Sequence, residues 1–99
     1  MDSVFREVFG SRPVVRIIDF FLDNQEFSYS LADVVREEKI SFQTAKPVFS
    51  ELVSSGILVE TSRVRKARKY SLDTSHEFVV RLLALDEALV ETSLGVSQV

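Results

Sequence analysis

The chain has no cysteine and no tryptophan, one histidine, three glycines and two prolines among its 99 residues. Without cysteine it cannot form disulfides or thiolate metal sites, which fits an intracellular protein. Gly10, Gly56 and Gly95 lie too far apart for a glycine-rich phosphate loop. His76 stands alone, so no nucleophile–base pair can be assembled from His or Cys. The sequence therefore predicts no enzyme, no metal site and no cofactor.

Long hydrophobic runs are also missing. No apolar run reaches the roughly 18 residues that a membrane-spanning helix needs. The N-terminal sequence MDSVFR lacks the basic and then apolar layout of a secretory signal. A chain with 45% hydrophobic and 27% charged residues has the composition of a soluble globular protein. Its 99 residues suffice for one domain, and we expect no membrane partner.

Basic charge is scarce overall and concentrated in one place. The net charge is −3, from 12 basic and 15 acidic residues, which argues against a general nucleic-acid coat protein. Residues 63–69 carry five basic residues and no acid, so this segment is +5 and the rest of the chain is −8. Two acidic pairs, Asp19 with Asp23 and Asp86 with Glu87, are interpreted as exposed helix faces. By itself the basic segment is either a solvated hairpin or an arm that binds phosphate.

Two helices are predicted near the N-terminus. Apolar residues at positions 4, 5, 8 and 9 indicate a short amphipathic helix that ends at Gly10. Ser11 is the expected N-cap of the next helix, with Pro13 in its first turn. That helix, about 12–23, is apolar nearly all round, so we expect it to be covered on two or more sides. Residues 27–29 are either a very short strand or an extended entry to the following helix.

The central part of the chain predicts two helices joined by a tight connection. Ser30 and Asp33 form an approximate capping box for a helix that runs to about Glu38. Ser41 is the expected N-cap of the second helix, whose apolar residues at 45, 48, 49, 52 and 53 face inward. Gly56 ends this helix. The opposite face and its flanks carry Gln43, Thr44, Lys46, Pro47, Ser50 and Ser54.

Pro47 does not fit a straight helix that starts after Ser41, because it removes one backbone hydrogen bond at a cost of up to ~3 kcal/mol. If Thr44 were the cap instead, Pro47 would lie in the first turn, where the missing donor is tolerated. We expect a first turn from Ser41 that is irregular or bent near Pro47.

A β-hairpin is predicted directly after Gly56. Its strands are expected at 57–61 and 68–72, where β-branched and aromatic residues are frequent, and the basic segment forms its tip. A last helix is expected over about 75–93, followed by a frayed tail over 95–99. Apolar residues at 78, 82, 85 and 89 of this helix follow the 4-3-4 spacing typical of coiled coils.

Two helices joined by a tight turn and followed by a hairpin predict a winged helix-turn-helix. The chain resembles the small archaeal winged-helix transcriptional regulators. The resemblance rests on LADVVRE at 31–37 and ISFQT at 40–44 for the two motif helices, and on LVSSGIL at 52–58 and RKARKYSL at 65–72 for the wing. It extends to VFGS at 8–11 and to the C-terminal helix.

The resemblance implies an α+β, mostly helical fold in which extra N- and C-terminal helices pack together. It also implies a cytoplasmic, homodimeric DNA-binding regulator. We expect a single domain over 1–94, with the helix-turn-helix at about 30–55 and the wing at about 57–72. Two positions depart from the family. Its recognition helix often carries Arg, Tyr or His where this chain has Lys46 and Pro47, and its wing tip often contains glycine where this chain has Arg65.

The expected DNA contacts come from the second motif helix and the wing. Gln43 can hydrogen-bond adenine, while Thr44 and Ser50 can contact bases or phosphates. Phe42 lies at the edge of the apolar stripe, where we favour core packing over contact with a thymine methyl group. Lys46 is either a phosphate contact or a solvated charge. The wing arginines are expected along a phosphate strand or in the minor groove. The predicted DNA-binding residues are Ser41, Phe42, Gln43, Thr44, Lys46, Ser50, Arg63, Arg65, Lys66 and Arg68.

The C-terminal helix is longer than the core of one copy needs. We expect it to pack on the apolar helix at 12–23 and against a second copy, which would place two recognition helices about one DNA turn apart. The rival interpretation is a winged-helix module that binds proteins and no longer reads bases. The expected partners are therefore duplex DNA and a second copy, and no effector site is evident. The predicted dimerisation residues are Val4, Phe5, Phe9, Phe78, Leu82, Leu85 and Leu89.

Overall fold

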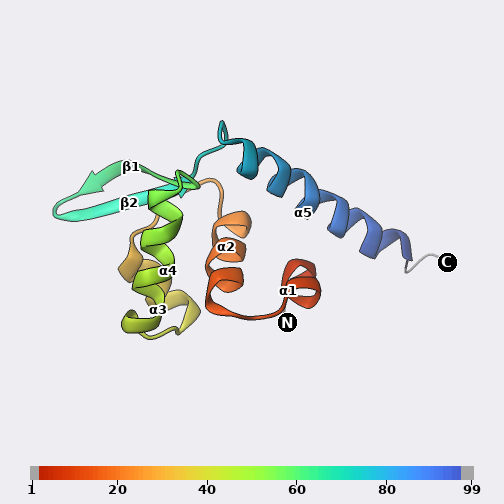
Figure 1. The fold of residues 1–99 in the computed structure, drawn as a ribbon, viewed down its shortest axis with the longest axis horizontal. Coiled ribbons are helices and arrows are strands. Elements are labelled where there is room, and N and C mark those ends of the chain that lie inside the picture. The colour runs from red at the N-terminus through yellow and green to blue at the C-terminus, as the bar shows by residue number, and fades with distance from the viewer. Residues whose placement is uncertain (1–2, 97–99) are drawn as a thin grey trace.

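The computed structural model describes residues 3–96, which form five helices and one two-stranded antiparallel sheet (Figure 1). The elements in chain order are α1 Val4–Phe9, α2 Pro13–Asp23, α3 Leu31–Glu38, α4 Phe42–Ser54, β1 Leu58–Val64, β2 Ala67–Leu72 and α5 Glu77–Val96. This is the winged helix-turn-helix predicted from the sequence, with α3 and α4 as the motif helices and the β-hairpin as the wing. The wing and α5 point away from the helical body in opposite directions.

The core forms where α2 packs against α3 and α4 and against the base of the wing. Its fully buried side chains include Ile17 and Phe21 of α2, Val34 of α3 and Leu58 of β1. Aromatic rings connect these elements, because Phe49 of α4 packs edge-on against a tyrosine of β2 with ring centroids 5.2 Å apart. The prediction that the apolar helix would be covered on several sides is confirmed, since α1, α3, α4 and β2 all contact α2.

The connection between α1 and α2 differs in one detail from the prediction. Gly10 follows α1 with a φ of 92°, a conformation that favours glycine, and its N–H donates to the Arg6 carbonyl at 2.7 Å. The N-cap of α2 is Arg12, which makes no side-chain capping bond. The prediction of Ser11 as the cap is therefore wrong. Pro13 occupies the first helical position, and this places the cap one residue later than expected.

The two motif helices begin where their caps predict. At α3 the Asp33 N–H donates to the Ser30 hydroxyl at 3.1 Å, and the Ser30 N–H donates to the Asp33 carboxylate at 2.8 Å, a complete capping box. At α4 the Ser41 hydroxyl accepts the Thr44 N–H at 3.2 Å. Between the helices Lys39 adopts a left-handed conformation with a φ of 56°, which makes the turn short.

Pro47 lies inside α4 without interrupting it. The helix is continuous from Phe42 to Ser54, and its first turn closes with the Ala45 N–H donating to the Ser41 carbonyl at 2.9 Å. The first turn is therefore regular as far as Ala45, and the alternative with Thr44 as the cap is wrong. The cap and the buried inner face of α4 stabilise the helix enough to accept one missing backbone bond.

The last helix begins at Glu77 and continues to Val96. The sequence predicted a helix over about 75–93 and a frayed tail over 95–99. Residues 97–99 of that expected tail lie outside the described residues. His76 precedes the helix: its Nδ1 accepts the Phe78 N–H at 3.1 Å, and its Nε2 lies 3.0 Å from the Ser55 carbonyl. These two bonds require the proton on Nε2. The single histidine is thus a structural link between the end of α4 and the start of α5.

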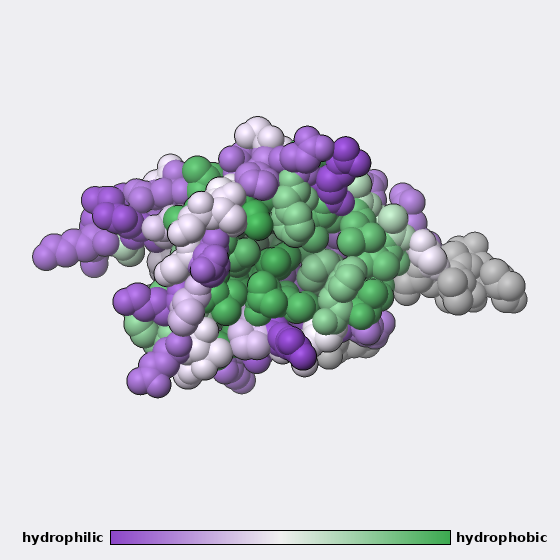
Figure 2. All heavy atoms as spheres, viewed as in Figure 1, coloured by the Kyte–Doolittle hydropathy of each residue, from purple (hydrophilic) through white to green (hydrophobic). Residues whose placement is uncertain are grey.

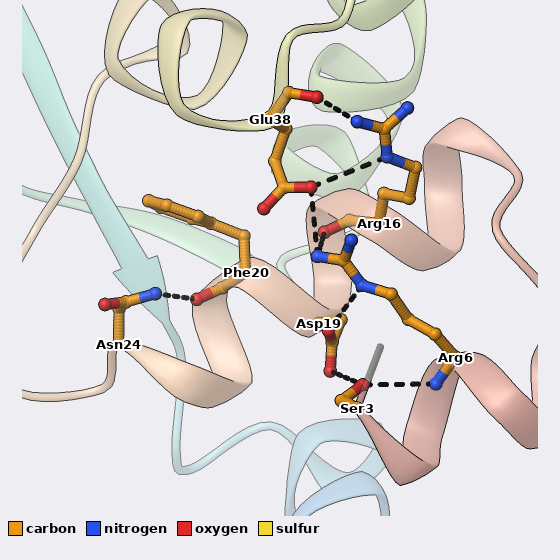
Figure 3. Close-up of polar contacts among 7 residues, drawn as sticks. All are labelled: Ser3, Arg6, Arg16, Asp19, Phe20, Asn24 and Glu38. Atoms are coloured by element: carbon orange, nitrogen blue, oxygen red, sulfur yellow. Dashed lines mark hydrogen bonds and ion pairs between the residues drawn. The ribbon is translucent and has the colours of Figure 1, made fainter. Parts of the chain in front are cut away.

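A cluster of charged side chains fastens α1 to α2 and α3 (Figure 3). Asp19 of α2 is 1% exposed and accepts hydrogen bonds from the Ser3 hydroxyl at 2.9 Å and from Arg6 Nε at 2.6 Å. Arg6 also lies 2.9 Å from the Glu38 carboxylate at the end of α3, and Arg16 donates to the Glu38 carbonyl. The exposed position expected for Asp19 is wrong, because these partners allow its carboxylate to be buried.

Candidate nucleic-acid interface

The outer face of α4 is held in place by its buried inner face. Ala45, Phe49 and Leu52 are buried in the core, so the opposite face of the helix must point outward. The six residues of the predicted DNA-binding set that belong to this helix and its cap are all exposed: Ser41, Phe42, Gln43, Thr44, Lys46 and Ser50. The Ser41 hydroxyl donates to the Thr44 hydroxyl at 2.8 Å, which orders the polar groups at the start of the helix.

Phe42 is not part of the core. Its side chain is 52% exposed at the first position of α4, so the favoured prediction of core packing is wrong. The apolar stripe of α4 points inward from Ala45 onward, and Phe42 lies on the flank of this stripe before the helix enters the core. Lys46 lies one turn later, with its Nζ 5.7 Å from the centre of the Phe42 ring, which is within the range of a cation–π contact.

The wing is longer and tighter than predicted. Its strands run over Leu58–Val64 and Ala67–Leu72, and Val64 pairs with Ala67, so that only Arg65 and Lys66 form the turn. Arg65 has a φ of 59°, a conformation that costs a non-glycine residue roughly 1–2 kcal/mol. Arg65 thus adopts a left-handed conformation that glycine would adopt at lower cost. The four wing residues in the predicted DNA-binding set, Arg63, Arg65, Lys66 and Arg68, are all exposed.

One acidic residue shares the wing with these cations. The Glu60 carboxylate lies 3.5 Å from Arg63 Nη2 and 3.9 Å from Arg68 Nε. Both are exposed pairs, which contribute little to stability and are screened by salt. Within residues 3–96, no ion pair involves Arg65 or Lys66. The tip of the wing therefore presents the positive charge that is most available to an outside anion.

Lys69, the fifth basic residue of the segment, turns back to the protein. Its Nζ donates to the Asp33 carboxylate of the α3 capping box at 2.7 Å. Burial alone would raise the pKa of Asp33, but hydrogen bonds from Lys69 and Ser30 outweigh it and hold that pKa well below its ordinary value. Lys69 is thus a structural cation that ties the wing to the helix-turn-helix.

Two further contacts anchor the wing to the segment before α3. Tyr29 and Tyr70 exchange two backbone hydrogen bonds of 2.8 Å each, so residues 27–29 supply a single bridge to the sheet. The hydroxyls of Ser28 and Thr61 are hydrogen-bonded beside an irregularity in the β1–β2 register. Sequence reasoning left the role of this segment open and did not find the Lys69 contact. The predicted capping box was the one sequence feature that could have indicated this contact, because the Asp33 carboxylate can accept a further hydrogen bond beyond the one from the Ser30 N–H.

Helix α4, the start of α3 and the wing enclose one concave surface. Its lining includes Lys46 and Ser50 from α4, Arg68 from β2 and Ser30 before α3. Its floor is apolar and includes Phe49, Val53 and Tyr70. The structure thus brings Arg68 of the wing and Lys46 and Ser50 of α4 to one surface. Hydrophilic side chains cover the wing in Figure 2.

The predicted dimerisation residues fall into three groups. Phe5 and Leu82 are buried inside this copy, where α1 and α5 meet, and are therefore core residues. Phe9, Phe78 and Leu85 remain 42–47% exposed. Val4 and Leu89 are partly buried. The expectation that the N- and C-terminal helices pack together is confirmed, and α5 makes this contact mainly with α1.

The exposed members of this set border an apolar groove between α1, α2 and α5. Its lining residues are Phe5, Phe9, Val15, Ile18, Phe78, Arg81, Leu82 and Leu85. Figure 2 shows apolar side chains gathered over these helices on the face seen in Figure 1. The groove lies away from the wing, so the molecule has a polar, cationic end and an apolar end. Exposed apolar patches of this kind are typical of protein interfaces.

Within the described part of the chain, no group of three or more His, Cys, Asp or Glu side chains is arranged to hold a metal ion. The same part contains no helix that is both long and apolar enough to span a membrane.

No protein-family model and no curated protein matches this chain. A solved structure of a ferric uptake regulator from Francisella tularensis with iron is similar to it, with a TM-score of 0.59 and 22% sequence identity. The similar region covers 68% of this chain and 55% of the regulator, so the chain spans little more than half of that protein. At this identity the likeness establishes a shared fold and nothing further.

Proposed function

We propose that this chain binds duplex DNA as a homodimer and regulates transcription. The observation that carries the proposal is the concave surface on which α4 and the wing meet. Lys46 and Ser50 of the motif helix and Arg68 of the wing line this one surface. The likeness in fold to a solved ferric uptake regulator supports the proposal.

In the proposed complex the exposed face of α4 enters the major groove. The exposed side chains of Gln43, Thr44 and Ser50 then face base edges and phosphates. The wing follows the neighbouring backbone, where Arg65 and Lys66 meet phosphates without first breaking an ion pair. Lys46 supplies a further phosphate contact at the edge of the groove. Because α4 has few strong base-reading groups, the wing contributes a large share of the affinity.

The apolar groove supplies the dimer contact in this proposal. Phe9, Phe78 and Leu85 are large apolar residues that one copy leaves exposed around it. A two-fold interface at this end would leave both wings free at the opposite ends of the dimer. The two recognition helices would then read half-sites of a pseudo-palindromic sequence.

Removing the wing charge tests the proposal. With Arg63, Arg65, Lys66 and Arg68 all changed to Ala, binding should weaken for every DNA sequence. The log–log dependence of affinity on salt should also flatten, by about 0.9 for each lost phosphate contact. Arg12→Ala, an exposed basic residue before α2, is the control and should leave the slope unchanged. Equal slopes for the wing variant and the natural chain would contradict the proposal.

The rival function is a protein-interaction module on the same fold. The −8 charge outside residues 63–69 and the apolar groove would then serve protein partners. A mobility shift of mixed genomic fragments, with competitor DNA over a range of salt, separates the two functions. Selective retention of some fragments supports a regulator. Failure to retain any fragment at low salt would favour the interaction module.

A further inference from the structure

The first residue of α4 presents an aromatic ring where the proposed interface needs base-reading groups. The Phe42 side chain is 52% exposed, although burying a phenylalanine gains roughly 1.5–3 kcal/mol. It follows the Ser41 cap, which fixes the direction in which the helix begins. The N-terminal residues of a recognition helix are those that reach base edges. The ring is therefore exposed at a position that DNA would cover.

Lys46 holds this ring from one side. Its Nζ lies 5.7 Å from the ring centre, four positions along the same helix. Side chains with this spacing are neighbours on a helix surface, and a cation over an aromatic face is attracted to it. The ammonium therefore restricts the ring and occupies one of its faces, while the rest of the ring stays open to solvent.

The surroundings of the ring favour nucleic acid over a protein partner. Its exposed neighbours on α4 are Gln43, Thr44 and Lys46, which are polar or charged. The large apolar side chains that would form a protein-docking surface gather instead around the groove of α1, α2 and α5. A single aromatic ring among polar groups suits a ligand that offers one small apolar group among hydrogen-bonding groups.

We propose that Phe42 is a specificity-determining residue that recognises thymine through its 5-methyl group in the major groove. Thymine is the one standard base whose major-groove edge carries a methyl group, and aromatic side chains contact it without hydrogen bonds. Lys46 is the positioning residue: it steadies the ring and binds the adjacent phosphate. This inference rests on the proposed DNA binding and adds to it the base that the helix reads.

The size of the effect follows from the area of one methyl group. Removing one methyl group from an apolar contact changes the affinity about fourfold. A dimer that reads one thymine in each half-site should then lose about fifteenfold when both methyl groups are absent. A change of this size is a small part of the total binding free energy, but the ratio of the two dissociation constants is readily measured.

The test uses the full chain and DNA in which thymine is replaced by uracil, which lacks only the methyl group. Duplexes are first selected from a random library with the natural protein and are then amplified with either dTTP or dUTP. Binding of the two pools is compared for the natural chain, Phe42→Ala and Lys46→Met. Thermal unfolding of each variant checks that the fold is retained, as expected for exposed residues.

The natural chain should bind the thymine pool about fourfold to fifteenfold more tightly than the uracil pool. Phe42→Ala should bind both pools equally, at the level of the natural chain on uracil DNA. Lys46→Met should weaken binding to both pools and keep part of the preference for thymine. Equal binding of both pools by the natural chain would overturn the inference and leave DNA binding intact. A preference that survives in Phe42→Ala would also overturn it. No binding to either pool would overturn the proposed function as well.

Discussion

At the scale of single residues, Asp19 is a charged side chain that is buried in the core. Asp19 is only 1% exposed. Hydrogen bonds from Ser3 and Arg6 to its carboxylate offset the free-energy cost of burying the charge. Arg6 in turn bridges to Glu38, so one guanidinium holds two carboxylates on two helices. Burial would lower the pKa of Arg6, but hydrogen bonds to Glu38 and Asp19 outweigh it and raise that pKa.

This cluster predicts strong coupling between Arg6 and Asp19. Asp19→Ala should lower the free energy of unfolding by about 3 kcal/mol, because it leaves the guanidinium without its buried partner. The double variant Arg6→Met with Asp19→Ala should lose clearly less than the single variants Arg6→Met and Asp19→Ala together. Urea unfolding of the four proteins measures this coupling. Strictly additive losses would show that the two side chains do not act as a pair.

At the scale of elements, the wing has a fixed direction because three contacts hold its base. The Tyr29–Tyr70 bridge joins it to the segment before α3, the Ser28–Thr61 hydroxyls add a second link, and Lys69 adds an ion pair to Asp33. A two-stranded hairpin alone is only marginally stable in water. These contacts let the wing keep a defined angle to α4 while its tip remains free to meet phosphate.

The Asp33–Lys69 pair predicts a loss of stability in acid. The folded-state pKa of Asp33 is lowered from 3.8, so its contribution is complete above about pH 4 and is lost as the pH falls below that value. Asp33→Asn keeps an acceptor for the Ser30 N–H but removes the charge. It should cost roughly 1 kcal/mol at pH 7, a modest value because the ion pair is partly screened by solvent.

Unfolding of the natural chain and of Asp33→Asn between pH 2 and 7 measures this effect. The difference between the two proteins should shrink steadily below about pH 4, as the natural carboxylate takes up a proton. Lys69→Met should also reduce the pH dependence, because it removes the strongest donor to Asp33. A difference that stays constant across this range would exclude the pair as its source.

At the scale of the whole molecule, the chain is long and has two unlike ends. Its principal extents are 51, 28 and 20 Å, with the wing at one end and α5 projecting at the other (Figure 1). Along α5, Val79 and Leu82 face the core, while Phe78 and Leu85 border the apolar groove. One copy therefore covers only one side of this helix, and the proposed second copy covers another.

The proposed dimer predicts that a charge in the groove separates the subunits. Leu85→Asp should raise the dimer dissociation constant at least about a hundredfold, since an unpaired carboxylate would be buried at the interface. Val80→Asp is the matched control, because Val80 is 49% exposed on α5 and does not line the groove. Sedimentation equilibrium measures both variants. The dimer contact lies elsewhere if Leu85→Asp associates as tightly as the natural chain, or if Val80→Asp dissociates as readily.

The sequence by itself determined the order of the elements and most of their ends. The caps at Ser30 and Ser41 and the glycine stop at Gly56 act on backbone groups a few residues away, so the residues that encode them are adjacent in the chain. Amphipathic spacing likewise identified the buried face of α4, whereas in α5 it found Leu82 but not the exposure of Phe78 and Leu85. The same local patterns were enough to predict a wing directly after a helix-turn-helix, and the structure confirms that fold.

Only the tertiary structure decided which side chains are free to act. Lys69 belongs to the basic segment by sequence, but its carboxylate partner lies 36 positions away. By sequence Asp19 looks like an exposed acid, but the folded chain brings Arg6 of α1 and its cap Ser3 into contact with the carboxylate. Phe42 fits a buried stripe by spacing, yet it precedes the point where α4 enters the core and is left exposed. Burial and ion pairing depend on contacts between distant segments, and these arise only when the helices pack.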